Sequence, residues 1–380
     1  MIDDTLGRQN LTVNQKLWQI HWFFVLILAV IASIGFAMLY SAAGGNIEPW
    51  AKQHAIRFII GVLLMIGVAI VDIRFWLRYA YLFYLVIFIL LIAVDVFGSM
   101  GMGARRWISF GYFTLQPSEL MKIAIVVSLA RYFHGGAIED ISRPMFLIIP
   151  ILIVALPAGF VFKQPDLGTS LILIATAIGV FFVAGVRLWK FFLLGILILA
   201  ALPFVWQNLH EYQQDRVLTF LSPESDPLGT GYHIIQSKIA FGSGGFSGRG
   251  FLQGTQGHLN FLPEMQTDFI FTMLSEELGL IGGLSILGLY IIILVYGFAI
   301  ASRSRSHFGC LLAMGVTITF FLYVFINMAM VMGLIPVVGV PLPLISYGGT
   351  AMLTLLLGFG LLMGVWIHRD TTIGQRGSAD

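Results

Sequence analysis

The feature that most constrains this chain is a series of long apolar runs that recur from residue 21 almost to its end. A helix needs about 20 apolar residues to cross a bilayer. Ten runs suggest such helices, at 21–41, 58–71, 79–97, 117–133, 145–162, 169–186, 188–206, 269–301, 308–332 and 348–368. With 58% hydrophobic and 11% charged residues, we expect an all-α, polytopic membrane protein with about ten transmembrane helices. The run 269–301 is long, and a break at Gly279 or at Gly282-Gly283 would change the number of helices by one.

Lysine and arginine in the short connections predict the orientation, because cytoplasmic loops carry the excess of these residues. The side that holds both termini has twelve: Arg8, Lys16, Arg74, Arg78, Arg131, Arg143, Arg187, Lys190, Arg303, Arg305, Arg369 and Arg376. The short loops of the opposite side have five: Lys52, Arg57, Arg105, Arg106 and Lys163. We therefore predict a cytoplasmic segment 1–20, a single transmembrane domain 21–368, a cytoplasmic tail 369–380 and one large extracytoplasmic loop, 207–267.

Several common functions have no visible site in the sequence. The single cysteine, Cys310, cannot form an internal disulfide, and the histidines show no metal-ligand spacing. No D-x-D pair, P-loop, H-E-x-x-H or G-x-S-x-G motif occurs. Because the basic residues are scattered between apolar runs, we expect no nucleic-acid partner.

Asp268 is the first candidate for chemistry. It lies in the stretch His258–Gly283, where the polar loop enters a strongly apolar helix on the predicted outer face. A carboxylate at this boundary carries a desolvation penalty that structural residues seldom bear. The loop before it is rich in Gly, Ser and Gln but also contains apolar residues such as Phe241 and Phe246, so we expect it to be ordered and to cover a substrate.

A second anomaly is the sequence QPSELMK at the start of the fourth run. If Pro117 begins this helix, Glu119 and Lys122 lie at positions i and i+3 of one face and can form an ion pair within the bilayer. Two interpretations stay open: a structural pair that pins two helices together, and a pair that takes part in ligand binding.

Two short exterior loops carry cations against the topological bias. One contains Arg105, Arg106 and Trp107, and the other contains Lys163 and Gln164. Guanidinium groups suit diphosphate oxygens, and an interfacial tryptophan suits lipid or sugar, so these residues predict an anionic ligand. The alternative is that they reach the membrane interface and pair with Asp166 or with lipid phosphate.

The loop before the last helix, PVVGVPLPLISYGG, has three prolines and predicts a rigid, non-helical entry at the outer face. It contains no Lys or Arg, so by itself it offers an anion no charge. Ser346, Tyr347 and backbone N–H groups are candidates for binding sugar hydroxyls.

Four stretches together resemble the SEDS family (shape, elongation, division and sporulation) of bacterial cell-wall polymerases. They are GARRWISFG with QPSELMK, the loop GYHIIQSKIAFGSGGFSGRGFLQGTQGHL, the run FLPEMQTDFIFTMLSEELG, and GVPLPLISYGG. They cover most of the chain from about Gly101 onward, in the family order. Within the family, HIIQSKIA and PLPLISYGGT are more similar to the rod-shape, elongation member than to the division member. Met265-Gln266 departs from the more usual Lys and His.

The resemblance implies a peptidoglycan glycosyltransferase that polymerises lipid II, an undecaprenyl-diphosphate-linked disaccharide, on the outer face of the inner membrane. It implies that Asp268 is catalytic and that Glu119 and Lys122 form a required buried pair. The implied partners are a class B penicillin-binding protein, which is a transpeptidase, and rod-shape scaffold proteins.

The residues are compatible with that chemistry. A lipid-linked sugar carries its own diphosphate leaving group, which requires cations more than a proton, so general acid catalysis can be omitted. The acceptor hydroxyl must lose its proton, and Asp268 is placed to serve as general base in a single, inverting displacement. No metal site is evident, although a divalent cation, Mg or Mn, stays open as a cofactor. A lipid II transporter (flippase) and a non-catalytic scaffold remain the rival hypotheses.

Overall fold

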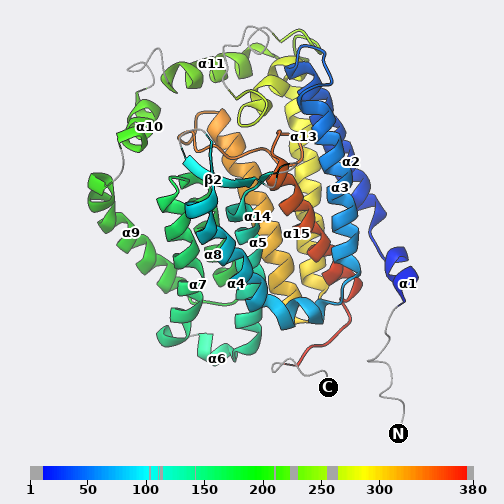
Figure 1. Cartoon of the computed structure of the whole chain (residues 1–380), viewed down its shortest axis with the longest axis vertical. Coiled ribbons are helices and arrows are strands. Elements are labelled where there is room, and N and C mark those ends of the chain that lie inside the picture. The colour runs from blue at the N-terminus through cyan, green and yellow to red at the C-terminus, as the bar shows by residue number, and fades with distance from the viewer. Residues whose placement is uncertain are drawn as a thin grey trace.

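The chain folds almost entirely into helices, as the computed structural model in Figure 1 shows. It describes residues 12–374 apart from 102–103, 110, 112–113, 142, 209–210, 223–229 and 255–263. The helices are α1 (Val13–Trp18), α2 (Trp22–Ala42), α3 (Trp50–Ile70), α4 (Ile73–Phe97), α5 (Pro117–Gly135), α6 (Ile138–Ile141), α7 (Pro144–Lys163), α8 (Leu167–Val183), α9 (Leu188–Asn208), α10 (Glu211–Leu221), α11 (Thr230–Ser243), α13 (Ile270–Arg303), α14 (His307–Val331) and α15 (Gly349–Ile367).

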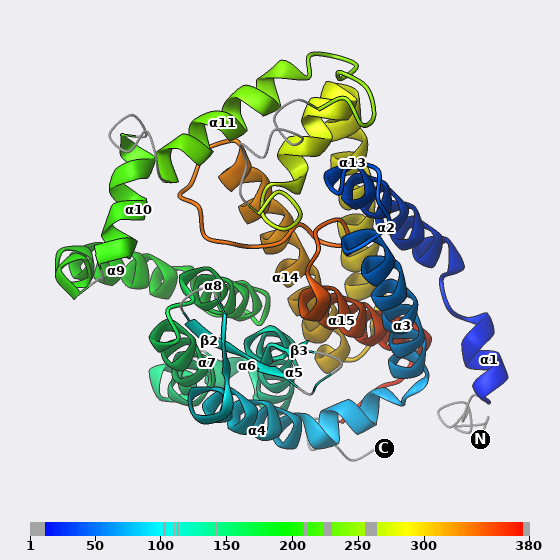
Figure 2. The same ribbon diagram turned by 45° about the horizontal axis from the view of Figure 1, so that its top comes forward.

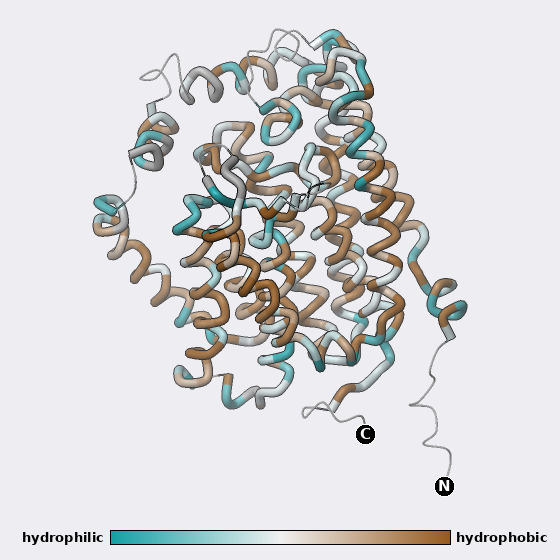
Figure 3. Tube along the Cα trace, in the orientation of Figure 1, coloured by the Kyte–Doolittle hydropathy of each residue, from teal (hydrophilic) through white to brown (hydrophobic). Residues whose placement is uncertain are grey.

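The prediction of an all-α, polytopic membrane protein is confirmed. Among the described residues, seven helices are long and apolar enough to cross a membrane: α2, α3, α4, α7, α13, α14 and α15. The helices α8 and α9 are apolar but have shorter apolar segments. The remaining predicted run, 117–133, is α5, with 19 residues, whose buried Glu119 and Lys122 lower its hydropathy. A brown belt of apolar residues runs across the upright helices in Figure 3.

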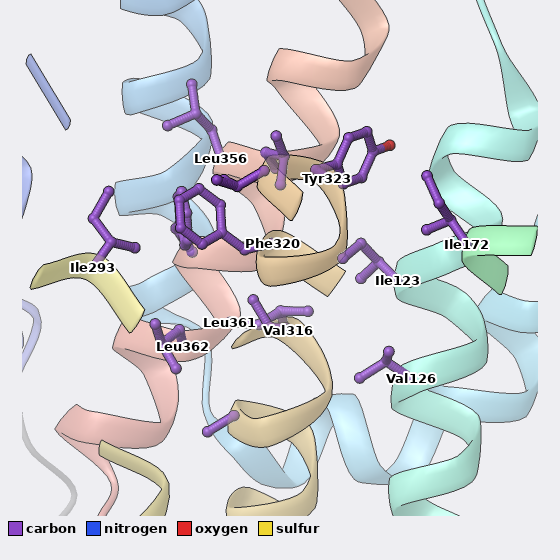
Figure 4. Close-up of a cluster of buried hydrophobic side chains, with 14 of the residues drawn as sticks. Ile123, Val126, Ile172, Ile293, Val316, Phe320, Tyr323, Leu356, Leu361 and Leu362 are labelled. Carbon is purple, nitrogen blue, oxygen red and sulfur yellow. The ribbon is translucent and has the colours of Figure 1, made fainter. Parts of the chain in front are cut away.

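Helix α14 lies near the centre of the bundle, as Figure 2 shows, and packs against α5, α8, α13 and α15. Phe320 of α14 lies in the apolar core, where its ring centroid is 5.6 Å from that of Tyr290 and 5.4 Å from that of Phe359. Figure 4 shows Tyr323 on the same helix, with its hydroxyl directed away from Phe320. By contrast α9 exposes large apolar side chains such as Phe192 and Leu199, as a lipid-facing helix does.

A small antiparallel sheet, which the sequence did not predict, joins α4 to α5. It consists of β1 (Ser99–Gly101), β2 (Ala104–Ser109) and β3 (Thr114–Leu115), in that order. Leu115 pairs with Ile108, so the chain returns directly to Pro117 at the start of α5. The sheet therefore carries Arg105, Arg106 and Trp107 on one strand beside the end of α5 that holds the buried ion pair.

Helix α13 is broken at Gly279, where φ is 67° and ψ is −161°, which is one of the two places that the sequence left open for a break. The glycine-rich segment 242–254 fills the gap. Arg249 N and Gly250 N donate to Glu276 O (3.0 Å) and Glu277 O (3.1 Å), and Leu280 N donates to Gly245 O (2.9 Å). Backbone groups that the break frees are thus satisfied by this segment, as membrane-embedded backbone requires.

The stretch 207–267, predicted to be extracytoplasmic, contains ordered structure in its described part. Helices α10 and α11 form an arc at the end of the molecule away from α1 and α6 (Figure 1), and α11 packs against α13 and α14. Residues 255–263, with His258, lie outside the described residues. The division into segments 1–20, 21–368 and 369–380 stays a prediction.

Candidate active site

Asp268 lies in a turn, residues 264–269, that leads into α13 at Ile270. The turn is closed by Thr267 N and Asp268 N, which both donate to Glu264 O at 3.0 and 3.2 Å. Phe269 at the N-cap is buried, whereas Asp268 keeps an intermediate exposure. The carboxylate of Asp268 faces Gly339, where a Cβ atom would come within 3.4 Å of its Oδ2. The side chain is therefore at the boundary between the buried helix and the exposed loop.

The turn is held by helix α14 and by the loop before α15. Asn327 Nδ2 donates to Asp268 O (3.0 Å) and to Val340 O (2.7 Å). Ser346 Oγ donates to Thr267 O (2.5 Å) and accepts from Leu342 N. Because these groups are buried, the main chain of Asp268 is fixed from two sides.

These contacts use two groups, the Ser346 hydroxyl and the Tyr347 N–H, that the sequence offered for binding sugar hydroxyls. The Ser346 hydroxyl hydrogen is used within the protein, and Tyr347 N donates to Gln266 O at 2.8 Å. Both groups position the Asp268 turn. Contact between sugar hydroxyls and the Tyr347 side chain stays a prediction.

Glu119 and Lys122 form the expected ion pair, with Lys122 Nζ 2.6 Å from Glu119 Oε1. Both are buried, and Tyr323 of α14, which the sequence analysis missed, completes the group. Lys122 Nζ donates to the Tyr323 hydroxyl, which in turn donates to Glu119 Oε2, and Nζ lies 4.4 Å from the Tyr323 ring centroid. The Lys122 ammonium is thus enclosed by its partners and does not reach a ligand in this arrangement.

One face of α14 links this ion pair to Asp268. Tyr323 and Asn327 are at positions i and i+4, so they lie one above the other on the helix. Tyr323 contacts the ion pair and Asn327 contacts Asp268 O. The signal in the sequence was a pair of polar residues inside an apolar run, which in a membrane helix indicates a functional or packing role.

Arg106 of the β2 strand lies against the α7–α8 connection beside Asp166. Arg106 Nε donates to Gln164 O (3.1 Å), its Nη2 donates to Pro165 O, and its Nε lies 4.0 Å from Asp166 Oδ2. The ion pair with Asp166 is the alternative that the sequence left open for Arg106. Gln164 is buried and donates to Leu91 O and Asp95 Oδ1 at 3.0 and 3.2 Å.

Arg105, Trp107 and Lys163 lie at the same end. Arg105 and Lys163 are exposed, Trp107 is partly buried, and Arg105 Nη1 lies 3.4 Å from Asp95 O. Gly168, just after Asp166, packs against the carbonyl of Val338, near the Gly339 that faces Asp268. The structure therefore brings Arg105, Arg106 and Lys163 to the end of the bundle where Asp268 lies.

Arg57 of α3 adds a cation that the sequence analysis did not assign to the site. Its guanidinium carbon lies 4.7 Å from the Tyr347 ring centroid, and its Nη2 donates to Gln53 Oε1 at 3.1 Å. Tyr347 OH also donates to Gln53 Oε1. Within the described residues, no carboxylate lies within 4 Å of Arg57, whereas Lys52 pairs with Glu48 at 2.6 Å. Tertiary structure thus gives the proline-rich loop the charge that its own sequence lacks.

An apolar cavity of about 300 Å³ lies beside the break in α13. Its lining includes Phe271, three residues after Asp268, and Met328, next to Asn327. Leu280 and Leu284, on the α13 side of the lining, are 47% and 57% exposed. The cavity is therefore accessible from the apolar surface of the bundle. In the described part of the chain, no three His, Cys, Asp or Glu side chains gather to hold a metal ion.

Comparison with known sequences identifies the family. The profile of FtsW, RodA and SpoVE, described as cell cycle proteins, matches residues 16–371. The chain belongs to this family, the SEDS proteins. The resemblance inferred from the four motifs is confirmed.

Among its relatives, the peptidoglycan glycosyltransferase MrdB of Escherichia coli strain K12 is 42% identical over 349 residues, which cover 91% of this chain and 93% of MrdB. The stage V sporulation protein E of Bacillus subtilis is 38% identical over 352 residues, covering 90% and 95%. This SEDS protein also matches a chain from a peptidoglycan synthase complex, with a TM-score of 0.80 and 33% identity, covering 92% and 98%. The rod shape determining protein RodA of Thermus thermophilus matches with a TM-score of 0.70 and 27% identity, covering 92% and 97%.

Proposed function

We propose that this SEDS protein is a peptidoglycan glycosyltransferase that polymerises lipid II, with Asp268 as its general base. The observation that carries the proposal is the fixed Asp268 turn, held by Asn327 and Ser346, at the end of the bundle where Arg57 and the β2 cations lie. The relatives named as peptidoglycan glycosyltransferases share most of the chain's length, which supports this activity.

The reaction needs one carboxylate. The acceptor hydroxyl oxygen attacks the anomeric carbon of the donor sugar as the bond to the diphosphate oxygen breaks, so that the electron pair leaves with the diphosphate. Asp268 takes the hydroxyl proton, and the product is inverted at the anomeric carbon. Arg57, Arg105 and Lys163, which are partly or fully exposed, are the cations available to stabilise the departing charge. Mg²⁺ binds well between one carboxylate and phosphate oxygens, so a divalent cation, Mg²⁺ or Mn²⁺, stays open.

The buried ion pair acts at a distance from the reacting atoms. Glu119, Lys122 and Tyr323 are almost inaccessible, at 4%, 1% and 2% exposure. Their contacts fix α14 against α5, and α14 carries Asn327, which fixes Asp268. We assign the pair a positioning role, which explains why a buried charge is retained in an apolar bundle.

The apolar cavity suits the lipid part of the substrate. It lies beside Phe271 and opens at the exposed leucines of α13, so a polyprenyl chain could enter it from the bilayer while its sugar stays near Asp268.

The cellular setting follows from charge and from the relatives. We propose that the protein spans the bacterial inner membrane with both termini in the cytoplasm, which places Asp268 outside, because the basic residues concentrate on the side of the termini. A class B penicillin-binding protein is the proposed partner, supported by the match to a chain of a synthase complex that coordinates polymerization and crosslinking. Rod-shape scaffold proteins would complete the assembly.

The test is to reconstitute the full chain with its transpeptidase partner in liposomes that contain labelled lipid II. Glycan strands that still form when the partner's transpeptidase activity is removed would support the polymerase. Movement of labelled lipid II across the bilayer without any strands would overturn it in favour of the transporter.

We expect Asn327→Ala to lower kcat about tenfold with little change in KM, because Asp268 O and Val340 O lose a shared donor and the turn moves by a fraction of an ångström. Steady-state polymerisation at several lipid II concentrations measures both constants. Thr319→Val is the control, since its hydroxyl bonds within α14 and to Thr176, away from the turn. A raised KM with unchanged kcat would assign Asn327 to substrate binding.

For Arg57→Gln, the expected result is a KM for lipid II raised by about tenfold or more, since a charge-assisted hydrogen bond contributes about 1.5–3 kcal/mol. The matched control is Lys52→Gln on the same helix, whose ammonium is exposed and paired with Glu48. Equal effects of the two variants would show that general surface charge, and not the Arg57 position, attracts the substrate.

A further inference from the structure

Two guanidinium groups meet at one tryptophan at the opposite end of the bundle. Trp366 lies in the last turn of α15, and the Cζ atom of Arg369 is 4.2 Å from its ring centroid. The Cζ atom of Arg303, from the last turn of α13, is 5.7 Å from the same centroid. Cations are favourable near the C-terminal ends of helices. That effect explains one arginine on each helix, but not why both converge on one indole.

His21 lies at the same indole. It is the N-cap of α2, just outside the membrane span, and its ring centroid is 4.3 Å from that of Trp366. Burial, and then the charges of Arg369 and Arg303, lower the pKa of His21. The imidazole is thus neutral at neutral pH, and the two arginines give this corner of the molecule a positive potential.

The positive charge exceeds the acidic charge around it. Asp370 lies 3.9 Å from Arg305 Nε and 3.8 Å from Arg369 Nε, and its side chain is 74% exposed. Arg303 has no carboxylate within 4 Å in the described part of the chain. Three arginines with a single exposed aspartate leave a local excess of cations that an anion from outside would compensate.

Exposed apolar side chains adjoin these cations on the membrane side. Trp22 and Phe23, at the start of α2, are 52% and 56% exposed. Tyr296 connects them, because its ring centroid is 5.6 Å from His21 and 6.2 Å from Phe23. Aromatic residues of this kind are enriched where lipid headgroups meet the hydrocarbon.

We propose that this corner, defined by His21, Arg303, Trp366 and Arg369, binds the headgroup of one anionic phospholipid of the leaflet that faces α1. Its phosphate lies between the two guanidinium groups, and its acyl chains run along Trp22 and Phe23. A free inorganic anion would use the cations but would leave the adjoining aromatic surface without a role, so the lipid is the better match.

The full chain in detergent is titrated with phosphatidylglycerol and, separately, with phosphatidylcholine, and bound lipids are counted by native mass spectrometry. Wild type is expected to retain one phosphatidylglycerol that phosphatidylcholine does not displace. Arg303→Gln is expected to lower the affinity for that lipid by about tenfold, as the loss of one charge-assisted contact implies. The affinity of Arg303→Lys, which keeps the charge, is expected to lie between those of wild type and Arg303→Gln.

Arg143→Gln is the matched control, since Arg143 lies before α7 on the predicted cytoplasmic side, is exposed and pairs with Asp140 at 3.2 Å. An equal loss in Arg143→Gln would overturn the proposal in favour of diffuse surface charge. Inorganic phosphate that displaces the retained lipid at similar concentration would overturn it in favour of a small-anion site. Arg303 is the residue replaced because its side chain is exposed, whereas Arg369 also donates to Trp366 O and its replacement would affect folding.

Discussion

Asp268→Asn should reduce glycan synthesis from lipid II by at least about a hundredfold, since general base catalysis contributes typically 10²–10⁴-fold. The amide has nearly the shape of the carboxylate but cannot take the acceptor's proton at neutral pH. The main-chain bonds that fix the turn, from Asn327 and Ser346, do not involve the replaced atoms. Turnover of labelled lipid II into strands, followed in the purified complex, measures the effect.

The neighbouring carboxylate provides a control for this variant. Glu264 lies in the same turn, where its Oε2 accepts from Thr267 Oγ1 at 3.1 Å. Glu264→Gln removes one negative charge from the turn while keeping an acceptor oxygen, so we expect a loss of no more than about threefold, as for a single neutral hydrogen bond. Retention of more than about a tenth of the activity in Asp268→Asn would show that another group takes the proton.

The sequence predicted those parts of the molecule that depend on local spacing. Apolar runs predicted the helices, and Pro117 with an i, i+3 interval predicted the Glu119–Lys122 ion pair on the first turns of α5. The glycines of the long run indicated two places for a break in α13, and the break is at the first, Gly279. In each case the determinant lies within a few residues of the feature, so no knowledge of tertiary contacts was needed.

The sequence did not predict the parts of the site that depend on contacts between residues far apart in the chain. Tyr323 and Asn327 lie inside an apolar run, and their partners are about 200 residues earlier for Tyr323 and about 60 residues earlier for Asn327. Arg57 comes to Tyr347 from the other end of the chain. The short strands β1 to β3 were not predicted either, because a glycine-rich stretch of two- to six-residue strands has no clear alternation.

Hydrogen bonds and ion pairs within the protein determine which cations are available to a substrate diphosphate. Arg106 bonds to two backbone carbonyls and lies near Asp166, and Lys122 is enclosed by Glu119 and Tyr323. Arg57 has five N–H donors, and most of them form no hydrogen bond within the described residues. Electrostatic stabilisation of the diphosphate is therefore better assigned to Arg57 and the exposed Arg105 and Lys163 than to the buried pair.

Lys122→Ala is the second prediction with a large effect. Removing one partner of a buried ion pair leaves Glu119 uncompensated, which destabilises by about 3–5 kcal/mol. We expect the unfolding temperature to fall and activity to drop by at least about tenfold. Lys52→Ala, at an exposed pair that contributes little to stability, should change neither quantity much. Thermal unfolding in detergent and strand synthesis at equal amounts of folded protein separate the two effects.

The double variant Glu119→Leu with Lys122→Met distinguishes a positioning role from a purely structural one. Replacing a whole buried pair by apolar residues of similar volume is often neutral for stability. The Tyr323 hydroxyl, however, loses both of its partners, so α14 is no longer fixed against α5 at the level from which Asn327 reaches Asp268. Most of the stability lost in Lys122→Ala should therefore return, less the cost of the unpaired Tyr323 hydroxyl, while activity stays at least about tenfold low. Recovery of both together would mean that the pair only holds the helices together and has no effect on the Asp268 turn.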